Sequence, residues 1–279
     1  MISIIIDYGI NGQWRPEPKT RRDSMKRLDG RIALITAAGS GMGRAGALRF
    51  ASEGAHVIVS DLNSEAAEKV VAEIKDAGGN ATARALDVSD VDAIKATFDW
   101  IEQEFGILHI LYNHAGIPGA SGLEVTAEQY EKAMDINLRS AFFATQYSVP
   151  LLQKAAPKAS IIFTSSTSGL VGSPFSPLYS LAKGGITVFM KAVAKRLGPD
   201  GIRSNAILPA MIETPMLSEF FGRNPGDDVE AVKKEFAKNV PLARAGSPDE
   251  VAAAAAFLAS DDSSWITGTA LPLDGGLLA

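Results

Sequence analysis

The segment Thr36-Ala-Ala-Gly-Ser-Gly-Met-Gly43 decides the fold of this chain. An apolar run over 32–36 leads into it, and a helical pattern follows over 44–52. A glycine-rich turn between a strand and a helix lets backbone amides and the helix N-terminus hold a pyrophosphate. The turn is therefore predicted to bind a dinucleotide cofactor through Gly39, Ser40, Gly41, Met42 and Gly43.

Strands and helices alternate along the rest of the chain. Further strands are predicted over 56–61, 82–86, 107–112, 160–163, 203–208 and 270–273. Helices are predicted over 64–76, 91–105, 126–133, 135–155, 179–197 and 248–258. This alternation indicates an α/β Rossmann fold, a doubly wound parallel sheet of about seven strands with helices on both faces. We expect a single domain over residues 28–279, with ligands at the carboxyl ends of the strands.

Composition excludes several classes of function. The chain has 279 residues, 46% hydrophobic and 21% charged, which is typical of a globular protein with a sizeable core. Its formal net charge is −5 and its basic residues are scattered, so we expect no nucleic acid partner. The apolar runs are too short to span a membrane. The absence of cysteine excludes disulfides and cysteine nucleophiles, and agrees with a cytoplasmic location.

Neither a metal site nor a secretion signal is expected. His56, His109 and His114 do not fall at metal-ligand spacing. Residues 1–27 have no periodicity and lack the apolar core and small-residue cleavage site of a signal peptide, so they are predicted to form a poorly ordered extension. Alternatively, synthesis begins naturally at Met25.

Asp61 ends the second predicted strand, where an acidic side chain can accept hydrogen bonds from a ribose diol and repel a 2′-phosphate. Leu62 and Asn63 follow it, where a phosphate would favour Arg or Lys. These residues predict NAD rather than NADP. The alternative for Asp61 is a structural acid at the N-terminus of the next helix.

Tyr179 and Lys183 lie four residues apart, one helical turn. Opposite charges about 4 Å apart at an effective dielectric of about 20 attract by roughly 4 kcal/mol, which would lower a phenol pKa from about 10 to about 7. A tyrosine with such a pKa can act as an acid or base at neutral pH. Alone, however, the pair could simply be a solvated helix face.

Several motifs in one order resemble the short-chain dehydrogenase/reductases of the common type, over about residues 28–279. The motifs are the glycine turn, Asp87-Val88, Asn113-His-Ala-Gly116, Asn137, Ser166, the Tyr179–Lys183 pair and the run from Pro209 to Thr214. Three positions depart from the family pattern, since Ala37 and Ala210 replace glycines and His114 replaces an asparagine. An alanine at a position with positive φ would destabilise the turn by about 1 kcal/mol or more.

The resemblance implies where the cofactor contacts lie. Asp87 and Val88 would flank the adenine, and Asn113, Ala115 and Gly116 would close the cleft after the fourth strand. Ile212 and Thr214, in the run that starts at Pro209, would hold the nicotinamide carboxamide. Asp61 and Leu62, together with the glycine turn, Tyr179 and Lys183, complete the expected cofactor site.

The resemblance also implies the catalytic residues. Tyr179 would exchange a proton with the substrate oxygen while Lys183 lowers its pKa and touches the nicotinamide ribose. Ser166, thirteen residues before Tyr179, would hydrogen-bond that oxygen, with Ser165 as the rival. Asn137 would hold a water that links the lysine to solvent. A helix kink satisfied by its own amide is the alternative for Asn137.

The remaining expectations concern the substrate and partner surfaces. A mobile lid is predicted over about 212–240. Apolar residues are expected to form the walls of the substrate pocket, or in part to pack in the core or at a subunit contact; they are Leu170, Val171, Pro174, Phe175, Met211, Met216, Leu217, Phe220 and Phe221. Helical stripes, one over Ile186, Phe189, Val193 and Leu197 and one over 141–151, face either the sheet or a partner subunit, and the family resemblance implies a homotetramer or homodimer.

Together these residues predict an NAD-dependent oxidoreductase that interconverts a secondary alcohol and a ketone. One alternative is a non-catalytic NAD(H)-binding sensor or scaffold of the same fold. Another is a 3-oxoacyl-type reductase that uses NADPH. An enoyl reductase or a sugar epimerase is disfavoured by Ser166 and the Tyr179–Lys183 spacing.

Overall fold

The computed structural model describes residues 26–222 and 228–279. Within these ranges, parallel strands form a single seven-stranded sheet in the order β3-β2-β1-β4-β5-β6-β7. The strands are β1 (Ile32–Thr36), β2 (His56–Asp61), β3 (Asn80–Ala85), β4 (Ile110–Asn113), β5 (Ser160–Thr164), β6 (Arg203–Pro209) and β7 (Ala270–Leu273). This confirms the predicted doubly wound α/β fold.

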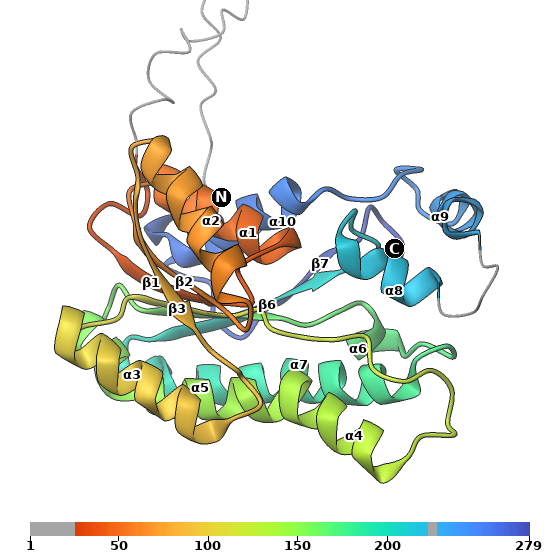
Figure 1. Cartoon of the computed structure of the whole chain (residues 1–279), viewed down its shortest axis with the longest axis horizontal. Helices are drawn as coiled ribbons and strands as arrows, with labels where there is room; N and C mark the ends of the chain where they lie inside the picture. Colours follow the sequence, from red (N-terminus) through yellow and green to blue (C-terminus); the bar gives the residue numbers. More distant parts are fainter. Residues whose placement is uncertain (1–25, 223–227) are drawn as a thin grey trace, which may run out of the picture.

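Helices cover both faces of the sheet (Figure 1). One layer contains α1 (Gly41–Ser52), α2 (Ser64–Asp76) and α10 (Pro248–Ala259). The other contains α3 (Val91–Phe105), α5 (Ser140–Ala155) and α7 (Pro177–Leu197). The remaining helices are α4 (Ala127–Met134), α6 (Ser168–Val171), α8 (Pro215–Phe221) and α9 (Val229–Lys238), with short turns at Asp135–Arg139, Gly198–Asp200 and Asp261–Ser263.

The central strands are continuous apolar runs because helices cover both of their faces. Leu34 of β1 pairs in register with Leu111 of β4, and both are fully buried. Ile35 of β1 belongs to the core beneath α1, α2 and α10, whereas Leu34 belongs to the core beneath α3, α5 and α7. Successive residues of one strand thus supply two separate cores, as the two-residue period of a strand requires.

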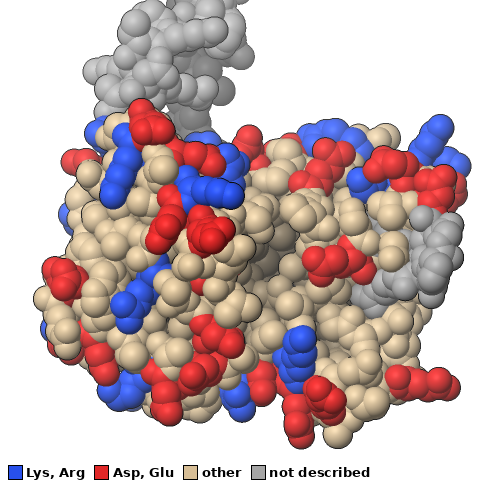
Figure 2. Space-filling view, viewed as in Figure 1, with Lys and Arg blue, Asp and Glu red and all other residues tan. Residues whose placement is uncertain are grey.

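Strand order reverses between β1 and β4, so the crevice for a ligand opens at the carboxyl ends of these strands. Figure 1 shows α8 and α4 on opposite sides of this end of the sheet. A hollow lies in the middle of the face shown in Figure 2, lined mainly by side chains that carry no charge. The topology therefore brings the glycine turn and the segments after β4, β5 and β6 to one edge.

Several strands and helices begin or end at residues other than those predicted. The fourth strand was expected over 107–112 but begins at Ile110, and the third covers Asn80–Ala85. The helix expected over 135–155 begins with a π-helical turn, Asp135–Arg139, before α5. Residues 1–25 of the expected extension and 223–227 of the expected lid lie outside the described residues. Arg27 already contacts the domain, because its guanidinium hydrogen-bonds Glu53 at 2.6 Å.

Candidate active site

The N-terminus of α1 is free to take an anion. Ser40 occupies the N-cap position with extended backbone but makes no side-chain cap, and the first turn of α1 contains no acidic residue. The first amides of a helix lack intrahelical partners and carry partial positive charge. The predicted pyrophosphate site therefore has the donors and the electrostatics that a dinucleotide requires.

The glycine turn is packed too closely for larger residues. A Cβ on Gly39 would lie 2.9 Å from Asp61 Oδ2, and one on Gly43 would lie 2.2 Å from the carbonyl oxygen of Ala37. Met42 packs partly buried against the core beneath α1. Ala37 has φ of 53°, so the replaced family glycine does sit in the left-handed region. The cost expected for an alanine there, about 1 kcal/mol, applies to this turn.

Asp61 is held at the end of β2 by two backbone amides. Its Oδ2 accepts from the amide of Gly39 at 2.9 Å, and its Oδ1 accepts from the amide of Asn63 at 2.9 Å. Asn63, not Asp61, caps α2 by accepting from Ala66. Leu62 beside it is largely exposed. The carboxylate is thus fixed next to the glycine turn, where the ribose of a dinucleotide is expected.

The adenine side of the expected cleft is formed after β3 and β4. Asp87 accepts hydrogen bonds from the hydroxyl and amide of Ser89, and these lower the pKa of its carboxyl. Val88, Asn113 and Ala115 line one small cavity together. These three sequence-predicted residues are therefore neighbours in space.

Thr36 and Asn113 fix the segment that follows β4. The Thr36 hydroxyl oxygen accepts from the amides of His114 and Ala115, both at 3.0 Å. The side-chain amide of Asn113 donates to the hydroxyl of Thr145 on α5 at 3.3 Å. The end of β4 is thereby tied to the end of β1 and to the helix layer below.

Gly116, Asn137 and Lys183 meet in a space without room for another atom. A Cβ on Gly116 would lie 2.8 Å from Asn137 Oδ1 and 3.1 Å from Lys183 Nζ. The Asn137 amide is satisfied at both ends by Ile117, accepting from its N–H at 2.9 Å and donating to its carbonyl at 3.0 Å. The π-helical turn that carries Asn137 is thus anchored to the segment after β4. That Asn137 also orders a water stays a prediction.

Ser166 and Tyr179 come together from the end of β5 and the start of α7. The Ser166 hydroxyl lies near the Tyr179 phenol and acts to lower its pKa, and it also accepts from the amide of Ser168 at 3.1 Å. Ser165, the rival serine, points into the protein instead and hydrogen-bonds the Lys183 carbonyl and the Thr187 hydroxyl, each at 2.8 Å. The structure places Ser166, and not Ser165, beside the tyrosine.

Lys183 is buried under the same site. Its ammonium donates to the carbonyl of Thr164 at 2.8 Å and lies 5.6 Å from the centre of the Tyr179 ring. Burial lowers the pKa of Lys183 to about 8. A neighbouring carboxylate would return this pKa towards its ordinary value, but no acidic side chain among the described residues contacts the amine.

The predicted pKa of about 7 for Tyr179 does not hold for the chain without a bound ligand. Loss of hydration raises the pKa of the phenol to about 12, and the neighbouring Ser166 hydroxyl opposes that rise only in part. The spacing argument assumed a direct contact between ammonium and phenol oxygen, whereas the ammonium is engaged by Thr164. In this state Tyr179 keeps its proton across the neutral range and is set to donate it.

The segment after β6, which is predicted to hold the nicotinamide, lies beside the end of β5. The Pro209 carbonyl accepts from the amide of Thr167 at 3.1 Å, which links the ends of β5 and β6. Ile212 forms an isolated parallel bridge with Gly246. Thr214 precedes α8 and approaches Gly41, where an added Cβ would lie 3.4 Å from its methyl group. The turn predicted to hold the pyrophosphate and the segment predicted to hold the nicotinamide carboxamide therefore meet.

His114 could be interpreted from the sequence as a tolerated substitution or as a residue that tunes a local hydrogen bond, and the structure places it among the site residues. Its Nδ1 lies 2.8 Å from the hydroxyl of Thr164, whose carbonyl accepts from Lys183. Burial, with a contribution from Lys183, lowers the pKa of His114 to about 3. In the sequence, only the replacement of the family's asparagine by His114 pointed to a special role for this residue.

The predicted apolar pocket walls are only partly correct. Met211 and Leu217 are buried in the protein, whereas Leu170, Val171 and Phe175 are exposed on the surface. Phe221 has no described side chain, so that prediction lies outside the described residues. Phe220 does reach the site, with its ring edge-on to Tyr179 at 5.2 Å between centres.

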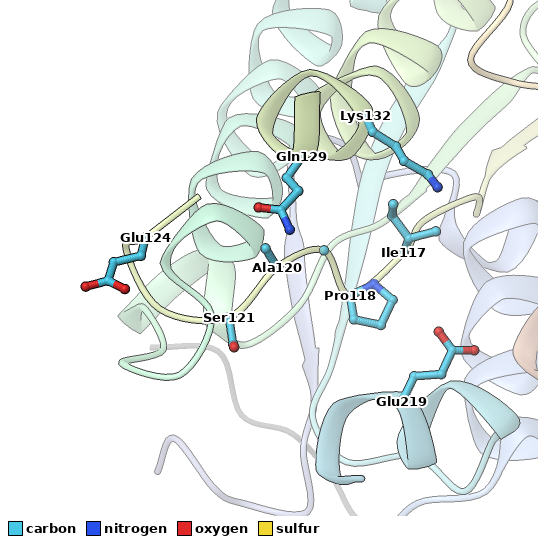
Figure 3. A pocket seen from close by; sticks show the side chains of 9 residues that line it. Ile117, Pro118, Ala120, Ser121, Glu124, Gln129, Lys132 and Glu219 are labelled. Carbon is cyan, nitrogen blue, oxygen red and sulfur yellow. The ribbon is translucent and has the colours of Figure 1, made fainter. Parts of the chain in front are cut away.

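Beside this contact lies a pocket of about 610 Å³ between the segment after β4 and α8 (Figure 3). Its lining differs from the predicted apolar wall. The residues are Ile117, Pro118, Gly119, Ala120, Ser121, Glu124, Gln129, Lys132 and Glu219.

Comparison with known proteins supports the same class. A family profile described as enoyl-(acyl carrier protein) reductase matches residues 36–278. The chain is 39% identical to a cyclohexanol dehydrogenase of Acinetobacter sp., over 89% of this chain and 95% of that protein. It is 37% identical to a 3-oxoacyl-(acyl-carrier-protein) reductase of Thermotoga maritima, over 90% of this chain and 99% of that protein.

A solved structure agrees in fold. Levodione reductase superposes with a TM-score of 0.86 at 33% identity, covering 90% of this chain and 98% of that one. The fold, the site and these similarities define a Rossmann-fold oxidoreductase. The chain belongs to the short-chain dehydrogenase/reductase family. Among the described residues, no helix has the length and apolar character needed to cross a bilayer, and no cluster of ligating side chains could hold a metal ion.

Proposed function

We propose that this protein is an NAD-dependent oxidoreductase that interconverts a secondary alcohol and a ketone, with Tyr179 as the general acid and base. The observation that carries the proposal is the convergence of Ser166, Tyr179 and Lys183 at the carboxyl ends of the central strands. The tightly packed Gly39–Gly43 turn and the uncapped N-terminus of α1 fit a bound dinucleotide. When bound, the nicotinamide accepts or supplies the hydride.

The residues of the chain supply proton transfer and positioning. In ketone reduction Tyr179 donates its phenolic proton to the carbonyl oxygen, and in alcohol oxidation it takes the hydroxyl proton. Ser166, which lies near the phenol, donates to the same substrate oxygen. We expect the positive charge of Lys183, 5.6 Å from the centre of the Tyr179 ring, to stabilise the phenolate once a ligand is bound. Asn137 fixes the backbone of Ile117 next to Lys183 and so keeps the amine in place.

The preference for NAD rests on Asp61. Two backbone amides hold its carboxylate beside the glycine turn, where it would accept from a ribose diol and repel a 2′-phosphate. We expect Asp61→Ala to narrow the ratio of kcat/KM with NAD to that with NADP by roughly tenfold or more. Asp76→Ala, an equal charge change at the end of α2, should leave the ratio unchanged. A wild-type enzyme that prefers NADP would overturn this assignment.

The similarity to an alcohol dehydrogenase favours oxidation of alcohols, and the similarity to a 3-oxoacyl reductase favours a second candidate that reduces 3-oxoacyl groups with NADPH. A screen of alcohols and ketones with both cofactors, read by ultraviolet absorbance of the reduced nicotinamide, separates them. No turnover with any substrate, despite nucleotide binding, would instead identify a sensor. A cytoplasmic homodimer or homotetramer completes the proposal.

A further inference from the structure

The ring of His114 contacts two parts of the site at once. On one side, Gly43 in the first turn of α1 lies so close that an added Cβ would be 2.8 Å from the His114 Cδ2 atom. On the other side, the ring Nδ1 lies 2.8 Å from the hydroxyl of Thr164, the last residue of β5. The imidazole therefore fills the space between the turn proposed to hold the pyrophosphate and the strand that leads to Ser166.

The position of this ring is fixed from further directions. The His114 amide donates to the hydroxyl of Thr36 on β1 at 3.0 Å, and the ring packs against Tyr112 of β4 with 5.4 Å between ring centres. A side chain locked by packing and by hydrogen bonds holds the groups on either side of it in place. The separation of Gly43 and Thr164 thus depends on the imidazole between them.

Thr164 joins the imidazole to Lys183. Its hydroxyl meets the ring Nδ1 of His114 and also donates to the phenol oxygen of Tyr112 at 3.1 Å. Its carbonyl accepts from Lys183 Nζ at 2.8 Å. Because this amine is buried and lies 5.6 Å from the centre of the Tyr179 ring, a shift of the Thr164 carbonyl would move the positive charge relative to the phenol.

No charge on the imidazole is needed for this link. The titratable groups next to the ring are the ammonium of Lys183 and the phenol of Tyr112, and burial together with Lys183 lowers the pKa of His114 to about 3. The ring is therefore neutral at every pH suited to an assay. A shift in the pH dependence of turnover on substitution of His114 would report on its neighbours and not on its own titration.

We infer that His114 is a positioning residue with two separate contributions: the ring edge against Gly43 supports the glycine turn, and Nδ1 holds Thr164 and through it Lys183. The inference rests on the proposed hydride-transfer function, within which it joins the cofactor turn to the lysine that assists proton transfer. It predicts that cofactor affinity and turnover respond to different substitutions at one position.

His114→Phe keeps an aromatic ring beside Gly43 and removes Nδ1. With saturating NAD, kcat/KM for an alcohol should fall by roughly tenfold, the effect of one lost hydrogen bond. The pH midpoint of kcat/KM should rise, since a displaced Lys183 stabilises the Tyr179 phenolate less. The dissociation constant of NADH, measured by fluorescence titration, should change by less than about twofold. Thr164→Val removes the same bond from the other side and should lower kcat/KM similarly.

His114→Asn makes the opposite change. Asparagine carries a polar atom bonded to Cγ, as Nδ1 is in histidine, but it lacks the ring atoms that touch Gly43. The dissociation constant of NADH should rise by roughly fivefold, because the turn loses those packing contacts. The pH midpoint of kcat/KM should match that of the wild type, and kcat/KM at saturating NAD should recover most of what His114→Phe loses.

His56→Phe is the matched control, because His56 makes the same kinds of contact at the start of β2, the opposite end of this strand from Asp61. Its Nε2 lies 2.9 Å from the hydroxyl of Thr82, and its ring lies 5.0 Å from that of Phe105. The substitution removes an imidazole–threonine hydrogen bond away from the site, so kcat/KM, its pH midpoint and NADH affinity should stay at wild-type values.

Two results would overturn the inference. One is wild-type kinetics in His114→Phe and Thr164→Val. The other is a parallel loss of kcat/KM and NADH affinity in both His114 variants, in proportion to the stability lost in denaturant unfolding, which would mean a purely structural role. Failure of the proposed function would appear differently, as no turnover of any alcohol or ketone by the wild type, and the NADH titrations would still test the contribution at Gly43.

Discussion

His114 connects three segments of the site through its backbone and its imidazole ring. Its backbone amide donates to Thr36 of β1, and its Nδ1 hydrogen-bonds Thr164 of β5. Its ring packs against Tyr112 of β4, with 5.4 Å between ring centres, and an added Cβ on Gly43 would lie 2.8 Å from its Cδ2. A charged imidazolium would lose hydration here and meet Lys183, so the ring stays neutral.

This environment predicts an acid-sensitive contribution to stability. The folded pKa of His114 is about 3, against an ordinary value of 6.5, so below pH 6.5 the unfolded chain binds a proton that the folded chain does not. The stabilisation is therefore present above pH 6.5 and is lost as the pH falls towards 3. Between pH 6.5 and 5 the free energy of unfolding should fall by about 1 kcal/mol per pH unit more in the wild type than in His114→Asn.

Denaturant unfolding at a series of pH values measures this difference. His56 and His109 are present in both proteins, so their effects cancel. Parallel pH profiles for wild type and His114→Asn would show that the imidazole is not held neutral as described.

For single residues, the catalytic side chains could be predicted from the sequence, but their pKa values and hydrogen-bond partners could not. The spacing of Tyr179, Lys183 and Ser166 could be read directly, because it follows the helical turn and the family pattern. The phenol pKa could not, because it depends on burial and on the Thr164 carbonyl that engages the lysine. A destabilised turn was predicted only if Ala37 has a positive φ, and the structure gives this residue a φ of 53°.

Among the elements, α8 controls the space next to Tyr179. The ring of Phe220 lies edge-on to Tyr179 at 5.2 Å between centres, so we expect it to limit the volume for a substituent on the carbinol carbon. We expect Phe220→Ala to raise the kcat/KM of bulky secondary alcohols relative to small ones by roughly tenfold. Phe220→Leu, which keeps apolar bulk, should give an intermediate ratio.

Steady-state kinetics on a series of alcohols of increasing size tests this role of α8. The affinity for NADH, measured in parallel, should stay the same in both variants. Unchanged size selectivity in Phe220→Ala would mean that the helix moves away before substrate binds.

The order and type of the elements could be predicted because apolar runs bounded by glycines are strong local signals. The helices 64–76 and 91–105 match the structure at both ends, and the side chains of Asn63 and Asp90 cap their N-termini. The π-helical turn at Asp135–Arg139 could not be predicted from periodicity. There the Asn137 side chain bonds to Ile117, a contact that only the folded chain creates.

At the scale of the whole molecule, an uncovered apolar face lies on α5 and α7. Ile186, Val193 and Leu197 of the predicted stripe are buried against the sheet and face no partner. On the other side of these helices, Val188 is 68% exposed, Leu181 56% and Phe142 46%. Phe142 contacts Phe189 of α7 at 5.3 Å between ring centres, so the two helices share this surface.

We expect this face to carry the contact between subunits. Val188→Glu would place a charge at its centre, and the charge would lose hydration in an interface. Light scattering coupled to size-exclusion chromatography should show the wild type as an oligomer and the variant as a smaller species. Lys69→Glu, a larger charge change at an exposed position of α2 in the opposite helix layer, serves as a comparison for charge alone. A wild-type monomer would contradict the assignment of this face.

The central claim is that Tyr179 transfers the proton, and the substitution Tyr179→Phe tests it most directly. Removal of one hydroxyl should lower kcat/KM for alcohol oxidation and ketone reduction by about 100-fold or more. NADH affinity, measured by fluorescence titration, should change by less than about twofold. Tyr130→Phe, on exposed α4, should behave as wild type. Turnover at the wild-type rate by Tyr179→Phe, with NADH bound normally, would contradict the account.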